Sequence, residues 1–426
     1  MSNQGYQPQP LRNAVAGHVG GGTPSRQVPS FWRGQIPWAS VKDFPEQSGI
    51  IDDTEEHIST SGLNASASNL ISAGTPLVCT RMAVGRAAMP SVPMAINQDV
   101  KAIFPAPGIS PAYLLKLLQF IQPKAEAQAV GSTVKGIRIQ EYLDIKAPIA
   151  ETDAQPTIAR VLDTLDTAIH ETEAIIAKLK AIKHGLLHDL LTRGIDANGV
   201  LRPPQAEAPH LYKESPLGWI PKEWDFAPLV SKIDFPEGQV DPRRVPYRDW
   251  VLIAPDHIES GTGRLISTAT AAEQQAISGK YVFQSGDVIY SKIRPYLRKA
   301  VLASNSGLCS ADMYPLRPKT GIDSRYLLAV ILGDQYSRFA ESVSMRSGFP
   351  KINRNEMAEF SIGWPSSDEQ SWVAHILSDA DIKQRTEEDQ LEKLRLLKAG
   401  LMDDLLTGRV RVTPLLAEAA QQTGSA

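Results

Sequence analysis

The sequence predicts an α+β fold made by internal duplication, in which two mixed α/β segments alternate with two long helices. The first observation behind this prediction is a repeat. The stretch GLLHDLLT from Gly185 to Thr192 returns as GLMDDLLT from Gly400 to Thr407, half a chain of 426 residues later. Without a gap, each residue from Gln155 to Thr192 can be set against the residue 215 positions further on. A fixed period of this kind marks a repeated structural unit.

The second observation is a narrow apolar seam in both repeats. Apolar residues recur at alternating intervals of three and four, and charged residues lie between them, which predicts long helices of coiled-coil type. A helix of roughly 35 residues spans about 50 Å. Two such helices in one chain pack most simply on each other, although an ordinary pair of core helices would give the same periodicity. The predicted seam residues are Leu162, Leu165, Ile176, Leu179, Leu186, Leu190, Leu377, Leu391, Leu394, Leu401 and Leu405.

The mixed segments are predicted from short apolar runs between turn residues, which indicate strands at 70–71, 75–81 and 94–96. A proline opens a predicted helix over 111–121. The glycine run at 20–22 lacks the lysine of a phosphate-binding loop and is interpreted as an ordinary loop.

The second mixed segment echoes the first. Gly286 falls 212 positions after Gly74, and Ile352 falls 215 after Ile137. This small drift in offset predicts insertions in loops only. The predicted parts are 1–150 and 216–366 for the mixed segments, 151–194 and 367–412 for the long helices, 195–215 for a Gly/Pro-rich linker and 413–426 for a flexible tail.

The overall composition limits the classes of function that this chain can have. The net charge of -3 and the pI near 6.3 argue against a generally basic nucleic-acid binder, although local basic patches remain compatible with them. The two cysteines lie in different halves and form no CxxC, so neither a disulfide framework nor a zinc site is indicated. No run of 18 apolar residues and no signal-peptide pattern occurs, so we expect a cytoplasmic protein that does not enter a membrane.

No catalytic signature is present. HExxH, GxSxG, a Walker motif and the Asn-Pro-Pro-aromatic and Asp-Pro-Pro-Tyr tetrapeptides of amino-methyltransferases are all missing. His184 and His188 have the spacing of two metal ligands on a helix, but Ala399 and Asp403 take their places in the second repeat and no third ligand is nearby. We therefore predict neither catalytic residues nor a metal site.

Basic and aromatic residues gather after Gly286. Strand alternation places four residues on one face, Val288, Tyr290, Lys292 and Arg294, and Tyr296, Arg298 and Lys299 follow beyond the break at Pro295. Arginine, lysine and tyrosine on one ridge suit contacts with phosphates and base edges. The alternative is a solvated strand edge that its charges protect from aggregation.

Several motifs, together with the order of the predicted elements, resemble the specificity subunit of type I restriction-modification systems. They are GGTPS ending at Ser25 with GQIPW ending at Trp38, SPLGWIPKEW from Ser215, GDVIYSKIR from Gly286, the Glu369-Gln370 pair after a proline, and the two helix ends. The resemblance covers nearly the whole chain. The first half departs from the pattern, because it lacks the LGWIP entry and has Ala154-Gln155 in place of Glu369-Gln370.

The resemblance implies two target recognition domains, each reading one half of a split DNA site, and two helices packed antiparallel as a coiled coil in a pseudo-twofold arrangement that fixes their spacing. It implies that the chain itself is not an enzyme and holds no cofactor. Its partners would be double-stranded DNA, two methyltransferase subunits and two restriction subunits, with S-adenosylmethionine, ATP and Mg2+ on these partner subunits. The residues predicted to contact DNA are Thr23, Ser25, Trp38, Thr80, Arg81, Arg86, Arg243, Arg244, Tyr290, Lys292, Arg294, Tyr296, Arg298, Lys299, Arg346, Lys351 and Asn353.

Two other classes of function are compatible with parts of the sequence. A non-enzymatic protein-interaction scaffold would explain the acidic balance and the missing motifs, and salt-dependent DNA binding would distinguish it from a DNA reader. A nuclease without a readable signature would reveal itself by metal-dependent nicking.

Overall fold

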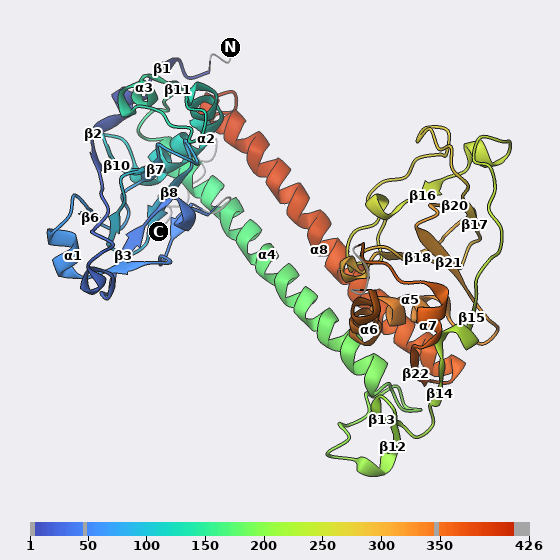
Figure 1. Ribbon diagram of the computed structural model, residues 1–426. Helices are drawn as coiled ribbons and strands as arrows, with labels where there is room; N and C mark the ends of the chain where they lie inside the picture. The colour runs from blue at the N-terminus through green and yellow to red at the C-terminus, as the bar shows by residue number, and fades with distance from the viewer. Residues whose placement is uncertain (1–4, 46–48, 345–348, 413–426) are drawn as a thin grey trace, which may run out of the picture. The chain divides into compact units, whose positions relative to one another are not determined.

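The computed structural model describes residues 5–45, 49–344 and 349–412 (Figure 1). The chain forms two compact units, unit 1 with Met1–Ile175 and Glu387–Ala426 and unit 2 with Ile176–Thr386. Each unit contains part of both long helices and is described by itself.

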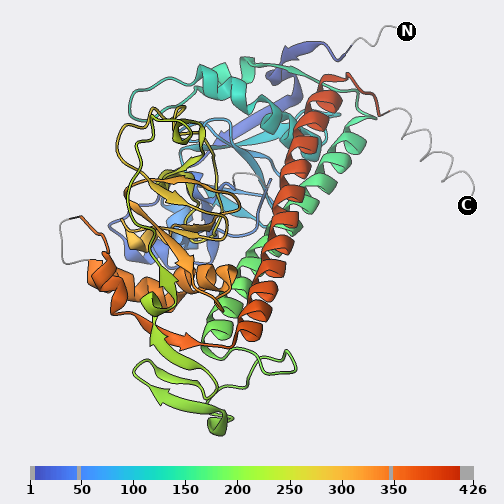
Figure 2. The same ribbon diagram turned by 90° about the vertical axis from the view of Figure 1, so that its right-hand side faces the viewer.

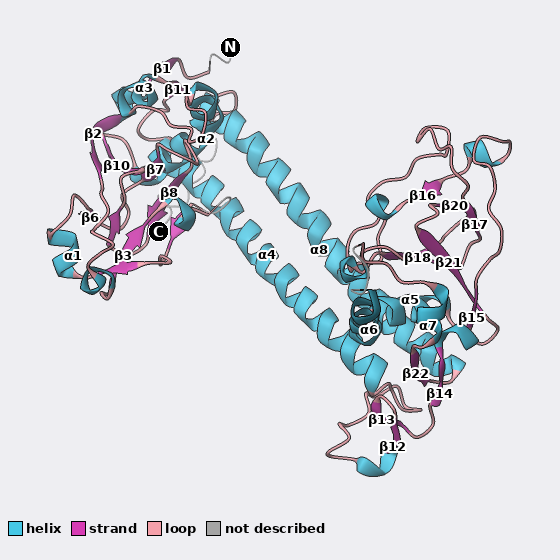
Figure 3. Cartoon of the chain, viewed as in Figure 1, coloured by secondary structure: helices cyan, strands magenta, loops and turns pink. Residues whose placement is uncertain are grey.

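Unit 1 is built on two mixed sheets (Figure 3). Five strands have the order β2-β10-β7-β8-β4, four have the order β5-β3-β9-β6, and β1 pairs with β11. The pairs β3/β9 and β4/β8 are parallel. The strands are β1 Pro8–Pro10, β2 Val15–Gly20, β3 Ile36–Ala39, β4 Ile50–Ile51, β5 His57–Ile58, β6 Asn69–Ile71, β7 Leu77–Cys79, β8 Ala87–Pro90, β9 Met94–Ile96, β10 Val100–Pro105 and β11 Lys146–Pro148.

Unit 2 repeats this plan with two smaller main sheets and two strand pairs. Four strands have the order β15-β21-β18-β19, three have the order β16-β20-β17, and β12-β13 and β14-β22 form pairs. The strands are β12 Tyr212–Ser215, β13 Gly218–Pro221, β14 Asp225–Pro228, β15 Ile233–Asp234, β16 Leu252–Ile253, β17 Tyr281–Phe283, β18 Val288–Ser291, β19 Ala300–Leu302, β20 Gly307–Cys309, β21 Met313–Pro318 and β22 Ser361–Trp364. The predicted linker therefore ends in a strand, since β12 begins at Tyr212.

The helices of each unit cover its sheets and carry much of its core. The predicted helix at 111–121 is present as the longer α2, whose buried leucines pack on the strands. Its counterpart in unit 2 is broken at Gly333 into α5 and α6. The helices are α1 Thr60–Asn64, α2 Pro111–Gln128, α3 Ile139–Asp144, α4 Gln155–Thr192, α5 Ser324–Leu332, α6 Asp334–Ser344, α7 Arg354–Ala358 and α8 Ser367–Thr407.

The duplication predicted from the sequence is visible in detail. The order β2-β10-β7-β8 of unit 1 returns as β15-β21-β18-β19 in unit 2. Gln155 and Gln370, which are 215 positions apart, are both buried at the start of a long helix. Gln155 accepts the N–H of Ser110 and donates to Ala150 O, and Gln370 likewise accepts from Asp323 and donates to Pro365 O. Each glutamine thus ties a long helix to the start of a shorter one.

The two long helices lie side by side and run antiparallel (Figure 2). In unit 1, Lys398 of α8 forms an ion pair with Asp166 of α4. In unit 2, Lys183 of α4 forms an ion pair with Asp381 of α8. The 215-residue offset relates both partners, so the two pairs are copies of one contact. Every predicted seam residue is buried or half-buried.

The ends of the described chain meet in unit 1. The Tyr6 N–H donates to Thr407 O at 2.8 Å, the Arg411 guanidinium lies 4.2 Å from the centre of the Tyr6 ring, and Arg411 pairs with Glu151 at 2.9 Å. Although unit 1 lacks the LGWIP entry, its chain is closed by these contacts around the end of α8.

Candidate nucleic-acid interface

The prediction of a basic ridge on one continuous strand is wrong. The strand β18 ends at Ser291, and all four of its residues are buried because the sheet is covered on both faces. Tyr290 is only 2% exposed and packs edge-on against Tyr336 at 5.4 Å. Its ring therefore belongs to the core of unit 2 and does not offer a contact surface.

Two predicted residues of unit 1 are also buried, which corrects their assignment. Trp38 is 3% exposed, and its Nε1–H donates to Gly22 O and Ser68 Oγ, both at 3.1 Å. Thr80 is 4% exposed, and its hydroxyl donates to Asp99 O at 3.1 Å. Both residues hold the loops of unit 1 together.

Beyond Ser291 the chain leaves the sheet and brings several predicted residues together. Lys292 lies with its Nζ 5.1 Å from the centre of the Tyr314 ring, and Arg294 and Tyr296 are exposed. The returning segment pairs with this loop through a bridge between Ile293 and Lys351. Lys292, Arg294, Tyr296 and Lys351 therefore form one exposed or half-exposed group.

Other predicted residues have structural partners. Arg298 pairs with Asp334 at 2.7 Å, and Lys299 donates to Pro255 O at 2.7 Å. Burial raises the pKa of Asp334, but the hydrogen bond from Arg298 and the positive charges around this carboxylate together outweigh burial and hold the pKa below its usual value. Asn353 accepts the Glu356 N–H at 3.0 Å as the N-cap of α7. These side chains stabilise the scaffold around the exposed group.

Arg243 and Arg244 lie in a separate exposed loop. Both contact Asp241, at 2.9 and 3.7 Å. The hydrogen bonds from the side chain and backbone of Arg243 lower the pKa of Asp241 to about 2, so this carboxylate stays charged and offsets part of the local positive charge.

In unit 1 the remaining predicted residues are dispersed. Arg81 pairs with Asp99 at 3.2 Å, and Arg86 donates to Phe44 O at 3.2 Å. Thr23 is exposed and donates to Gln98 Oε1 at 2.5 Å. Ser25 is exposed and accepts the Gln27 N–H at 3.4 Å. Arg346 lies outside the described residues.

The comparison with known families decides the identity. A family model described as Type I restriction modification DNA specificity domain matches residues 17–181 and 256–396, well over half of the chain. The chain belongs to this family. The resemblance inferred from the sequence motifs is thus confirmed.

Relatives in two organisms support the family assignment. The type I restriction enzyme EcoDI specificity subunit of Escherichia coli is 28% identical over 71% of this chain and 70% of its own. The MjaVIII specificity subunit of Methanocaldococcus jannaschii is 23% identical over 71% of both chains. The S subunit of a type I restriction-modification system from M. genitalium has a TM-score of 0.59 at 13% identity, covering 95% of this chain and 97% of that chain. The predicted fold class is confirmed.

Sequence reasoning did not single out Met82, which the structure leaves exposed at the position that matches Arg294. Met82 is 64% exposed and follows Arg81 directly, in the loop after β7. The 212-residue offset that relates β7 to β18 also relates Met82 to Arg294. This offset was the available signal, but methionine is not a residue type that suggests DNA contact.

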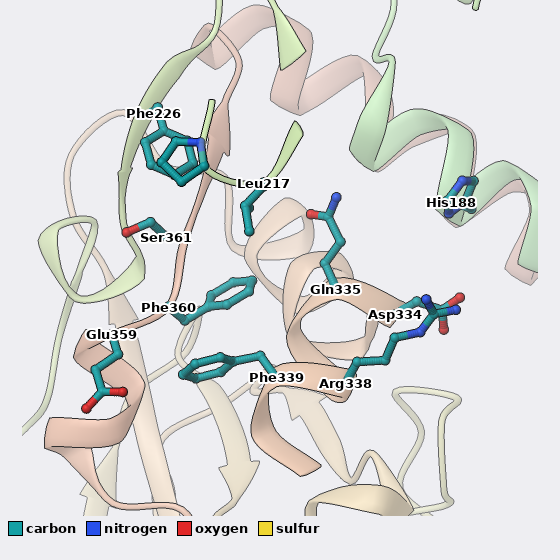
Figure 4. A pocket seen from close by; sticks show the side chains of 11 residues that line it. His188, Leu217, Phe226, Asp334, Gln335, Arg338, Phe339, Glu359, Phe360 and Ser361 are labelled. Carbon is teal, nitrogen blue, oxygen red and sulfur yellow. The ribbon is translucent and has the colours of Figure 1, made fainter. Parts of the chain in front are cut away.

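The described residues contain no group of three or more His, Cys, Asp or Glu side chains that could hold a metal. His188 instead borders a pocket of about 400 Å³ in unit 2, whose wall includes the packed rings of Phe339 and Phe360 (Figure 4). Both cysteines are buried, which raises the pKa of the Cys309 thiol to about 12. No helix of the described chain is long and apolar enough to span a membrane.

Proposed function

We propose that this chain is the DNA-reading subunit of a type I restriction-modification complex, in which each unit reads one half of a split site. The observation that carries the proposal is the pair of matched units with unlike exposed side chains. The strand order and the loops at the strand ends agree between the units. The same position in these loops is Met82 in unit 1 and Arg294 in unit 2. Two different half-sites require such a difference, because base-reading side chains must change with the bases.

The partners of the proposed complex are two methyltransferase subunits, which would bring S-adenosylmethionine, and two restriction subunits, which would bring ATP and Mg2+. Membership of the specificity family supports these partners. The net charge of -3 also supports them, because subunits that enclose the duplex can supply the phosphate neutralisation that this chain lacks. In this proposal the chain performs no catalysis and works in the cytoplasm, where the DNA is.

The long helices would set the gap between the two half-sites. With 38 and 41 residues, α4 and α8 are each about 57–62 Å long. Half-sites one turn of the double helix apart are about 34–36 Å from centre to centre. Helices of this length are therefore adequate as a spacer even when their ends are embedded in the units.

The test is coexpression with the methyltransferase subunit of its type I system, followed by sequencing that detects methylated adenine across the genome. We expect a split motif of two short blocks around a fixed gap. A stable complex that methylates no such motif would contradict the proposal. DNA binding by that complex would then be measured against salt concentration, because a protein-interaction scaffold would give no salt-dependent binding.

A further inference from the structure

The loop after β7 in unit 1 is held by three main-chain hydrogen bonds. The Thr80 N–H donates to Asp99 O at 2.8 Å, the Ile137 N–H donates to Thr80 O at 2.9 Å, and the Met82 N–H donates to Lys135 O at 2.9 Å. These bonds connect the end of the strand to the segment that returns before α3. The backbone at Met82 is therefore fixed from both sides.

The loop after β18 in unit 2 has the same three bonds. The Lys292 N–H donates to Asp312 O at 3.0 Å, the Ile352 N–H donates to Lys292 O at 2.9 Å, and the Arg294 N–H donates to Pro350 O at 2.8 Å. The offset to unit 1 is 212 for the residues after the strand, 213 for the two aspartates and 215 for the returning segment. The frame around Arg294 is thus a copy of the frame around Met82.

Both frames hold a non-glycine residue in the left-handed region. The φ angle is 65° at Met82 and 49° at Arg294. In the described chain the other non-glycine residues with positive φ are Gln275 and Arg298. A residue with a Cβ is disfavoured in this conformation, and such strain persists where a frame imposes it, often at functional sites. Two of these four residues occupy matched positions in the two units, which indicates that the two positions have the same function.

The two side chains are presented outward. Met82 is 64% exposed, and Arg294 is exposed with its guanidinium 5.8 Å from the centre of the Phe349 ring. Their neighbours Arg81 and Arg298 are instead held by Asp99 and Asp334. Tyr296 is exposed as well, but Met82 and Arg294 are the exposed residues that the same backbone frame holds at matched positions in both units.

We propose that Met82 and Arg294 are equivalent specificity-determining residues, one for each half of the DNA site. Arginine reads guanine through O6 and N7 in the major groove, and an apolar side chain reads the methyl group of thymine. Arg294 accordingly selects a G·C pair in one half-site, and Met82 selects an A·T pair in the other. This inference rests on the proposed function, whose own failure the test below detects separately.

The test uses Arg294→Gly and Met82→Gly, each in the full complex with the methyltransferase subunit. Glycine favours the left-handed region, so the loop keeps its backbone while the side chain is lost. We expect Arg294→Gly to relax one base position in one block of the methylated motif, with discrimination there falling roughly 10- to 100-fold. Met82→Gly should relax one position in the other block only.

Gln275→Gly is the matched control, because Gln275 is exposed in unit 2 with φ 51° and lies outside both loops. Its motif should equal that of the wild type. Unchanged motifs in both test variants would overturn the inference. So would a binding-site selection in which Arg294→Gly weakens binding equally for every base, since that is the behaviour of a phosphate contact. A wild-type complex that methylates no split motif would refute the proposed function instead.

Discussion

At the level of single residues, different clusters of side chains hold the ends of the chain segments together in the two units. In unit 2 the Glu369 carboxylate accepts hydrogen bonds from Arg202 at 2.5 and 3.2 Å, from Trp224 Nε1 at 3.2 Å and from the Ile195 N–H at 2.9 Å. Glu369 and Arg202 are 9% and 6% exposed. A buried carboxylate with this many donors is fully satisfied, so the loss of its charge leaves a buried guanidinium with the exposed Glu223 as its remaining carboxylate partner.

Replacing Glu369 by alanine should therefore destabilise unit 2 by about 3–5 kcal/mol. The measurement is the urea midpoint together with hydrogen exchange of the Ile195 amide. The matched control is Glu151→Ala in unit 1, where the side chain is 61% exposed and pairs with Arg411. An exposed pair contributes about 0–1 kcal/mol, so equal effects of the two changes would contradict this account.

Residue-level contacts were the least predictable part of the molecule. The sequence showed which stretch was basic, but the assumed alternation required β18 to run past Ser291. Because the strand is short and covered on both faces, Tyr290 is in the core, and Arg294 is displayed by a bend in the backbone. Backbone strain of this kind depends on hydrogen bonds to segments about 20 and 55 residues away in sequence, which no local pattern reveals.

At the level of elements, the long helices were the most predictable part. Their apolar period is sustained over many turns, and the predicted second helix and α8 both begin at residue 367. The sequence placed the end of that helix at 412, whereas α8 ends at Thr407 because Gly408 adopts φ 73° and terminates it. The break between α5 and α6 was not predicted, since the apolar pattern continues on both sides of Gly333.

The ion pair between Lys183 and Asp381 should help fix the helix register. Both side chains are about three-quarters buried, and the pair joins two helices that could otherwise slide along an apolar seam. Lys183→Asp should destabilise unit 2, and Asp381→Lys added to it should restore part of the loss. We expect a coupling energy of about 1–2 kcal/mol from a double-mutant cycle in urea.

The comparison for this cycle is the more exposed pair of Glu173 and Arg395 in unit 1, which is 2.8 Å apart. Its coupling should remain below about 1 kcal/mol. If the two cycles give the same coupling energy, burial is not what gives the Lys183 pair its strength.

At the level of the whole molecule, the helices should act as a ruler for the DNA site. Deleting one heptad from each helix, Ile175–Ala181 and Gln390–Leu396, keeps the apolar seam in register and removes about 10 Å of helix. The gap in the methylated motif should shorten by about three base pairs, at 3.4 Å each, while both blocks keep their sequence. An unchanged gap would exclude the ruler, and altered blocks would show that the deletion had damaged a unit.

The division of the chain into units also orders the events of synthesis. Unit 2 is one uninterrupted stretch, Ile176–Thr386, whereas the core of unit 1 includes residues of the segment 387–412 in addition to those before Ile176. Leu405, Leu406 and Val412 belong to the same core cluster as Leu11 and Ile158. On the ribosome, the half that emerges first is thus the last to be completed, and it waits for the entire second unit to be translated.

At about 5–20 residues per second, that wait lasts at least ten seconds or so. During this time the apolar surface of unit 1 that α8 will cover is open to chaperones and proteases. A chain that stops short of α8 would therefore carry a finished second unit beside an unfinished first one. Because the two units share the long helices, the amino-terminal half can complete its fold only after the carboxy-terminal half has been translated.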